Sequence, residues 1–103
     1  MLVDLRHDVW SVQSLRHWIA DQPPEDGYDY NDCRECLIAK YLKQKIGYKY
    51  TIVNGSFASI DHCAFHPLPA HFNDIAVGIG SRSDWTFGKA LERCDKVLAL
   101  QYA

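Results

Sequence analysis

The sequence has no long hydrophobic run and no excess of basic residues. Apolar stretches such as Cys36–Ala39 and Val97–Leu100 fall far short of the roughly 20 residues that a bilayer-spanning helix needs. Because 11 basic residues stand against 13 acidic ones, the formal net charge is -2, which argues against attraction of nucleic acid to the whole surface. We therefore expect no membrane span and no direct nucleic-acid partner, and any electrostatic partner must meet a local patch of charge.

Internal repeats, low-complexity tracts and linkers are also absent. A chain of 103 residues with 48% hydrophobic content is predicted to be one domain, residues 1–103, that buries roughly two thirds of its unfolded surface. Charged residues enter the first eight positions at Asp4, Arg6 and Asp8, which is too early for a secretory signal. We expect a cytoplasmic protein, in which the four cysteines stay reduced unless a metal or a catalytic cycle uses them.

The first and last helices are predicted from caps and apolar spacing. Residues 11–21 begin with Ser11, a good N-cap, and prolines at positions 23 and 24 forbid continuation. The last helix is predicted to be capped by Ser83 or Asp84, and its apolar residues recur at the spacing of a core-facing stripe. The residues of this stripe are Phe87, Ala90, Leu91, Cys94, Val97 and Leu98.

Another helix is predicted from Cys33 to Ile46. Asp32 and Glu35 stand at its start as a pair analogous to a capping box, and Gly47 ends it. The predicted core face consists of Leu37, Ile38, Tyr41 and Leu42.

One β-hairpin is predicted between these helices. Residues 48–53 are β-branched and aromatic, and Asn54-Gly55 is a strong turn signal before residues 56–60. We expect residues 61–69 to be irregular and residues 69–76 to form two helical turns. The expected fold is a small α+β domain of three or four helices packed with a short antiparallel hairpin.

The cysteines offer a metal site as one interpretation. Cys63 and His66 repeat the two-residue gap between Cys33 and Cys36, which on spacing alone is a Cys3His zinc pattern. Against this, Cys36 falls within a predicted helix, where a small buried residue is expected. The main expectation is therefore a protein without a cofactor. A small zinc-binding interaction module remains the alternative, and its ligands would be Cys33, Cys36, Cys63 and His66.

Catalytic interpretations have less support. A thioredoxin-like pair needs a strand that leads into the helix of Cys33, and residues 23–27 are no such strand. His62 and Cys63 are adjacent in sequence, whereas a Cys/His nucleophile pair is assembled in space. Residues 78–82 precede a helix as a phosphate cradle would, but Asp84 puts a negative charge at the helix start. We expect a protein that is not an enzyme.

Charge is distributed unevenly along the chain. Six acidic residues fall within residues 21–35, which contain Arg34 as their one basic residue, and residues 36–60 contain no acid. The simplest interpretation is a solvated loop followed by a solvated helix face. The functional interpretation is an acidic, tyrosine-bearing segment, residues 25–35, that docks on a basic protein surface. Its predicted partner-binding residues are Glu25, Asp26, Tyr28, Asp29, Tyr30, Asp32 and Glu35.

Three stretches of the chain resemble signatures of a family of small uncharacterised proteins found in prophages and mobile elements of proteobacteria. They are YDYNDCRECLIAKYL (residues 28–42), LPAHFNDIAVG (residues 68–78) and DWTFGKALER (residues 84–93). The matching residues are Cys36, Leu37, Ala39, Tyr41, Leu42, Trp85, Thr86, Phe87, Gly88, Ala90 and Leu91. Cys33, Cys63 and His66 match nothing in that pattern, which weighs further against structural zinc.

Some small phage proteins of similar character are anti-CRISPR inhibitors. The resemblance thus implies a phage-borne, non-enzymatic inhibitor that acts in the host cytoplasm. Its expected partner is a host protein or ribonucleoprotein complex that handles nucleic acid, with a CRISPR-Cas effector as the first expectation. The acidic segment would then act as a DNA mimic, because a surface built for phosphates attracts other clustered negative charge.

Overall fold

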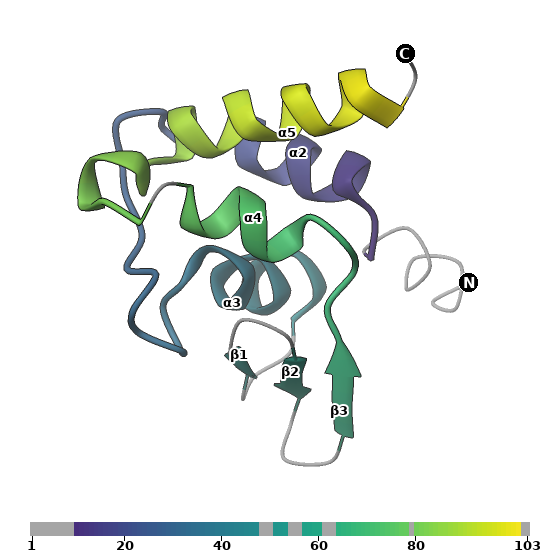
Figure 1. Cartoon of the computed structure of the whole chain (residues 1–103). Coiled ribbons are helices and arrows are strands. Elements are labelled where there is room, and N and C mark those ends of the chain that lie inside the picture. Colours follow the sequence, from purple (N-terminus) through teal and green to yellow (C-terminus); the bar gives the residue numbers. More distant parts are fainter. Residues whose placement is uncertain (1–9, 48–50, 54–56, 61–63, 79, 102–103) are drawn as a thin grey trace.

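The computed structural model describes residues 10–47, 51–53, 57–60, 64–78 and 80–101, which form three layers (Figure 1). Helices α2 and α5 make one layer, α3 and α4 lie in the middle, and three short strands lie beyond them. This is the small α+β fold that the sequence predicts. None of the helices in the described part of the chain combines the length and apolar composition needed to cross a bilayer.

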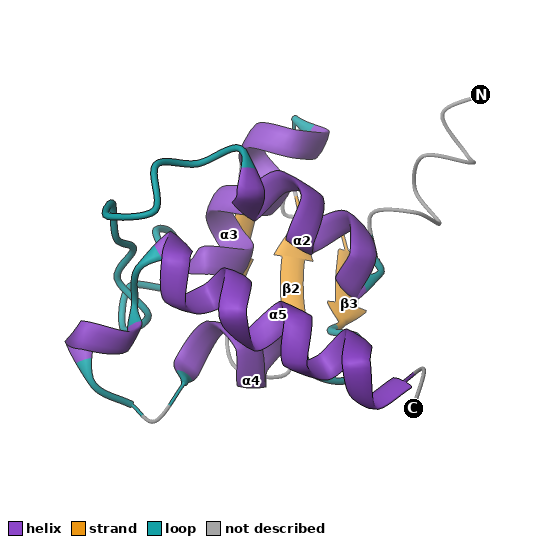
Figure 2. Cartoon of the chain, turned by 90° about the horizontal axis from the view of Figure 1, so that it is seen from above, coloured by secondary structure: helices purple, strands orange, loops and turns teal. Residues whose placement is uncertain are grey.

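The outer layer consists of α2 (Val12–Ala20) and α5 (Phe87–Gln101), which lie side by side (Figures 1 and 2). The Ser11 Oγ accepts a hydrogen bond of 3.2 Å from a backbone N–H of the first turn, so the predicted cap of α2 is confirmed. The rings of Trp18 and Phe87 meet edge to face, with centroids 5.7 Å apart. This contact joins α2 to α5, and the Trp18 ring also lies 5.6 Å from that of Tyr41 in the middle layer, centroid to centroid.

The start of α5 differs from the prediction. Thr86 is the N-cap, because its Oγ1 accepts the backbone N–H of Lys89 at 3.2 Å. Residues Arg82–Asp84 instead form the separate 3-10 turn η2, so the predicted cap at Ser83 or Asp84 is wrong. The physical reason is a β-bridge between Thr86 and Gly27, which holds Thr86 outside the helix. Of the predicted stripe, Phe87, Ala90 and Cys94 are buried, and Leu91, Val97 and Leu98 are partly buried against the core.

The middle layer begins with α3 (Leu37–Tyr41), which continues as the π-helix η1 (Leu42–Ile46) and ends at Gly47. The prediction that this helix starts at Cys33 is wrong by four residues. Cys36 is extended, with φ -71° and ψ 169°, and serves as the N-cap. The predicted core face is confirmed, since Leu37, Ile38, Tyr41 and Leu42 are buried.

The sheet has the strand order β1-β2-β3, and both neighbouring pairs are antiparallel. Strands β1 (Thr51–Val53) and β2 (Phe57–Ile60) pair as the predicted hairpin does, although its turn at Asn54 and Gly55 lies outside the described residues. Strand β3 (Ala64–Pro67) corrects the prediction that residues 61–69 are irregular. Its pairing to β2 supplies the hydrogen bonds that so short a segment lacks alone.

Helix α4 (Phe72–Val77) overlaps residues 69–76, where two helical turns are predicted, and ends one residue later. It buries Phe72, Ile75 and Ala76 against α3 and α5, and it ends at Gly78, whose φ of 58° suits glycine. A Cβ at this glycine would lie 2.9 Å from the Cβ of Asp84. The close approach brings the end of α4 against the loop before α5.

Candidate functional site

An open groove of about 430 Å³ lies where the acidic segment meets the start of α5. Glu25, Asp29 and Glu35 bring three carboxylates to this groove, and Lys40 and Arg82 bring basic groups. Gly27, Tyr28, Trp85 and Thr86 complete its lining. The fold therefore brings three of the five predicted acidic residues together, in a groove that also carries positive charge.

Backbone hydrogen bonds fasten the acidic segment to the residues before α5. The N–H of Tyr28 donates to the carbonyl of Trp85 at 3.0 Å, and the N–H of Phe87 donates to the carbonyl of Asp26 at 2.9 Å. A Cβ at Gly27 would lie 2.8 Å from the Trp85 carbonyl oxygen, so only glycine permits this approach. The carboxylates are thus held on a fixed backbone, although the segment has no regular secondary structure.

Tyr28 is buried, which corrects its prediction as a partner-binding side chain. Only 7% of the residue is exposed. Its hydroxyl donates to the carbonyl of Ala76 at 2.7 Å and accepts from the Arg93 guanidinium at 2.8 Å. Burial raises the pKa of Tyr28 to about 12. This tyrosine holds the acidic segment to α4 and α5 and offers a partner almost no contact area.

Tyr30 is half-buried and is also engaged within the protein. Its hydroxyl donates to Oδ1 of Asn73 at 2.7 Å, and its ring lies 5.5 Å from that of Trp85, centroid to centroid. The sequence prediction therefore overestimates how much of a binding surface these two tyrosines provide. The acidic side chains remain the groups that a partner can reach.

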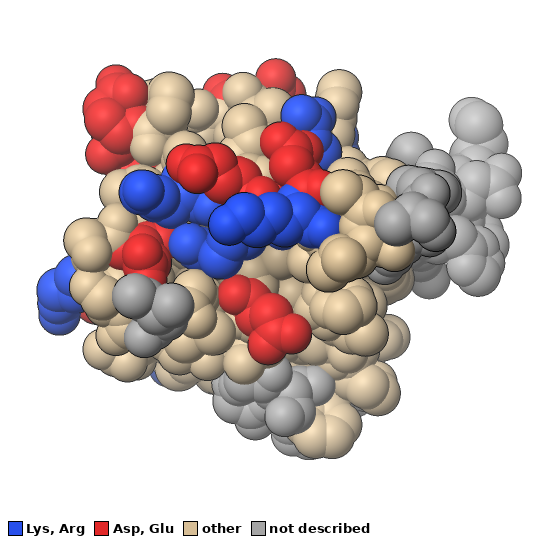
Figure 3. Space-filling view, turned by 45° about the horizontal axis from the view of Figure 1, so that its top comes forward, with Lys and Arg blue, Asp and Glu red and all other residues tan. Residues whose placement is uncertain are grey.

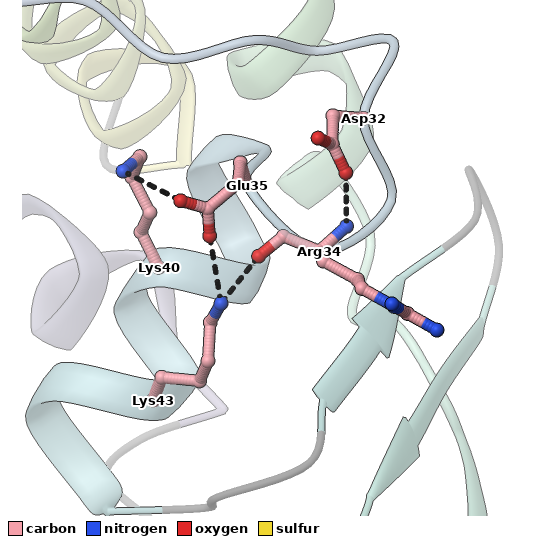
Figure 4. Close-up of polar contacts among 5 residues, drawn as sticks. All are labelled: Asp32, Arg34, Glu35, Lys40 and Lys43. Carbon is pink, nitrogen blue, oxygen red and sulfur yellow. Dashed lines mark hydrogen bonds and ion pairs between the residues drawn. The ribbon is translucent and has the colours of Figure 1, made fainter.

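Asp29 and Asp32 hold turns of the acidic segment. Oδ1 of Asp29 accepts the backbone N–H of Asn31 at 3.1 Å, and Oδ1 of Asp32 accepts that of Arg34 at 2.9 Å (Figure 4). Both are hydrogen bonds to a residue two positions on, as in Asx turns. The predicted capping box of Asp32 and Glu35 is wrong, because α3 starts beyond both residues.

Glu35 is paired with two lysines of the helix that follows it. Its carboxylate lies 2.8 Å from Nζ of Lys43 and 3.6 Å from Nζ of Lys40, and the Lys43 ammonium also donates to the carbonyl of Arg34 (Figure 4). The hydrogen bond from Lys43, followed by the charges of both lysines, lowers the pKa of Glu35 below its usual range. The net charge of this part of the groove is therefore not negative.

Glu25 and Asp26 remain as exposed carboxylates that take part in no ion pair within the described residues. Charge is mixed on one face of the molecule. Figure 3 shows a face on which Lys and Arg side chains form a central band, with Asp and Glu side chains on both sides of it. Within the described residues, Glu35 is thus the acid of this segment whose charge is balanced by an ion pair, whereas Glu25, Asp26, Asp29 and Asp32 have no such pair.

Two of the proposed zinc ligands, Cys33 and His66, lie at opposite edges of the sheet. The carbonyl of Cys33 accepts the N–H of Val53 at 2.8 Å on the outer edge of β1, whereas His66 lies on β3, opposite Ala58 of β2. With strands about 4.8 Å apart, the backbones of Cys33 and His66 are roughly 14 Å apart, whereas two zinc ligand atoms lie within about 4 Å of each other. The His66 ring stacks on Trp10, with centroids 5.4 Å apart.

The remaining cysteine of that set, Cys63, falls outside the described residues. Within the part that the structure describes, no group of three or more His, Cys, Asp or Glu side chains is placed to hold a metal ion. The separation of Cys33 and His66 weighs against the four-ligand zinc site, whose test is the metal content of the protein.

Arg93 is a residue that the sequence did not single out. Its Nε donates to the carbonyl of Ile75 at 2.7 Å, and one terminal nitrogen donates to the carbonyl of Asp84 at 2.9 Å and to the hydroxyl of Tyr28. These bonds join α4, η2 and the acidic segment. Tyr28 and Arg93 are 65 positions apart, so no local pattern predicts their contact.

Comparison with protein-family models, with curated proteins and with solved structures gives no match. The functional interpretation therefore depends on the groove and on the charges of the acidic segment.

Proposed function

We propose that this protein is a non-enzymatic inhibitor that docks on a basic surface of a nucleic-acid-handling complex through its acidic segment. A CRISPR-Cas effector in the cytoplasm of the host cell is the target class that the sequence resemblance favours. The observation that supports this proposal is the groove at the start of α5, in which Glu25, Asp29 and Glu35 converge.

Pre-organisation of the acidic segment favours binding. The bonds to Trp85 and Phe87, the Asx turn of Asp29 and the buried hydroxyl of Tyr28 fix the backbone before a partner arrives. A partner therefore loses little free energy in ordering this surface. Glu25 and Asp26 supply attraction that is not already used by a lysine.

Glu35 contributes less than its position suggests. Its carboxylate is already paired with Lys40 and Lys43, so a cation from the partner must compete with two lysines. Exposed ion pairs contribute little free energy each, so this competition is feasible but adds little affinity. The main attraction is therefore assigned to Glu25 and Asp26.

The test compares two charge reversals of the same residue type. Glu25→Lys changes the groove, whereas Glu92→Lys changes an exposed glutamate of α5 away from it, and both change the net charge equally. A panel of purified CRISPR effector ribonucleoproteins is incubated with each protein. Binding of the protein to each effector, and binding of that effector to its target DNA, are measured at two salt concentrations. We expect Glu25→Lys to weaken binding about tenfold, mainly by slowing association, and Glu92→Lys to leave it nearly unchanged.

Added salt should weaken wild-type binding steeply, because exposed charges act over about 8 Å at physiological ionic strength. Binding that is independent of salt and tolerates Glu25→Lys would contradict the role of the acidic segment. If the protein binds none of the effectors in the panel, the proposed target class is contradicted.

A further inference from the structure

A second hollow shares none of its lining residues with the groove. It has a volume of about 250 Å³ and is formed between the loop before α3, strand β1 and helix α4. Its lining combines apolar side chains with a polar rim and two thiols. The residues that line it are Tyr30, Asn31, Cys33, Cys36, Ile38, Val53, Leu68, Asn73 and Ala76.

The two thiols of this hollow differ in accessibility. Cys33 is exposed and Cys36 is 4% exposed. Burial raises the pKa of Cys36, so its thiol is rarely ionised near neutral pH. Cys94 lies elsewhere, fully buried in α5, and its pKa is raised to about 12. Of the described cysteines, Cys33 is therefore the one that a reagent in solution can reach.

We propose that this hollow is a binding site for a small thiol compound with an apolar tail, which Cys33 holds as a mixed disulfide. The tail would lie against Ile38, Val53 and Leu68, while the amides of Asn31 and Asn73 stand near its polar groups. The volume suits a benzene-sized tail, since an apolar cavity of about 150 Å³ can bind benzene. A peptide-sized thiol such as glutathione is too large to enter fully.

The exchange needs a small disulfide as its second reactant. The Cys33 thiolate attacks one sulfur of that disulfide and a new sulfur–sulfur bond forms, while the original bond breaks. The other half leaves as a thiolate and takes up a proton. Cys33 is oxidised and the departing half is reduced, so no further oxidant is required.

The experiment measures how the hollow selects among tails. Protein carrying Cys63→Ser is incubated with excess 2-mercaptoethanol and one of two disulfides, phenethyl or hydroxyethyl, and the labelled fraction is read by intact mass spectrometry. Peptide mapping then assigns the labelled cysteine. We expect Cys33 to retain the phenethyl group at least about tenfold more strongly, which corresponds to about 1.4 kcal/mol.

Two variants distinguish the hollow from the thiol alone. Leu68→Ser removes an apolar wall at a partly buried position and should abolish the preference for the phenethyl group. Ala20→Cys combined with Cys33→Ser moves the thiol to the exposed end of α2, where both disulfides should label alike. The phenethyl adduct at Cys33 should also raise the melting temperature.

Equal labelling of Cys33 by the two disulfides would overturn the proposal. The same holds for a preference that persists in Leu68→Ser or appears equally at the thiol introduced in α2. Preferential labelling of Cys36 would show that Cys33 is not the residue that holds the compound, and would also overturn the proposal.

Discussion

Replacement of Tyr28 by phenylalanine tests whether the Tyr28 hydroxyl holds the acidic segment to α4 and α5. Tyr28→Phe keeps the ring but removes the bond to the carbonyl of Ala76 and the bond from Arg93. Ala76 lies in the last turn of α4, where carbonyls lack partners within the helix. The substitution therefore removes a side-chain donor from a buried carbonyl.

The expected cost is a loss of about 1.5–3 kcal/mol in the free energy of unfolding. One lost bond involves a neutral carbonyl and the other a charged guanidinium, and such bonds contribute about 1 and about 1.5–3 kcal/mol. Their sum is an upper limit, because Arg93 keeps its bonds to the carbonyls of Ile75 and Asp84. Tyr30→Phe is the matched control. It removes one bond to the amide of Asn73 at a half-buried site, for which about 0.5–1.5 kcal/mol is expected.

The dependence on pH gives a second measurement of the same substitution. The pKa of Tyr28 is about 12 in the folded protein and about 10 in an unfolded chain. Its contribution to stability is therefore fully present below pH 10 and is lost as the pH rises towards 12. Tyr28→Phe should make this alkaline loss shallower by about 1.4 kcal/mol per pH unit. Part of the loss should persist, because Tyr41 and Cys94 also have a pKa of about 12.

Urea unfolding followed by tryptophan fluorescence at pH 7, and repeated between pH 9 and pH 11, provides both values. If Tyr28→Phe costs no more than Tyr30→Phe and leaves the alkaline slope unchanged, the hydroxyl does not anchor the acidic segment, and the reasoning is refuted.

Two further predictions concern the core and the cysteines. Leu15→Ala should cost about 2–5 kcal/mol in urea unfolding because Leu15 is fully buried, whereas Leu100→Ala, at a residue that is 78% exposed, should cost less than about 0.5; equal costs would contradict the packing of α2 on the core. Purified protein should carry less than about a tenth of an equivalent of zinc, and a chelator should leave its melting temperature unchanged, because a structural zinc contributes folding free energy directly; stoichiometric zinc by elemental analysis would contradict this.

Local signals predicted those parts of the fold that local interactions form. The Ser11 cap and the spacing of Leu15 and Trp18 identify α2, because these residues are close together in the sequence. The hairpin of β1 and β2 follows from β-branched residues on each side of a turn signal. Strand β3 escaped prediction because its four residues include Pro67 and gain their hydrogen bonds only from β2.

The candidate site was predicted only in outline, because its details depend on contacts between distant residues. The concentration of acidic residues is visible in the sequence, but the burial of Tyr28 requires Arg93 and Ala76. The pairing of Glu35 with Lys43 spans eight residues and crosses the start of α3, so the helical i,i+4 rule does not find it. That start is itself displaced, because the carbonyl of Cys33 is bonded to Val53 of β1.

The bond between Cys33 and Val53 also covers part of one edge of the sheet. A sheet edge with unpaired N–H groups is a template for another strand, and natural proteins cover or interrupt such edges to avoid aggregation. Here the loop before α3 takes the outward N–H of Val53, and Pro67 at the opposite edge has no N–H to offer. A change that lifts this loop would therefore show first as edge-to-edge polymerisation at high concentration, before any loss of the helices.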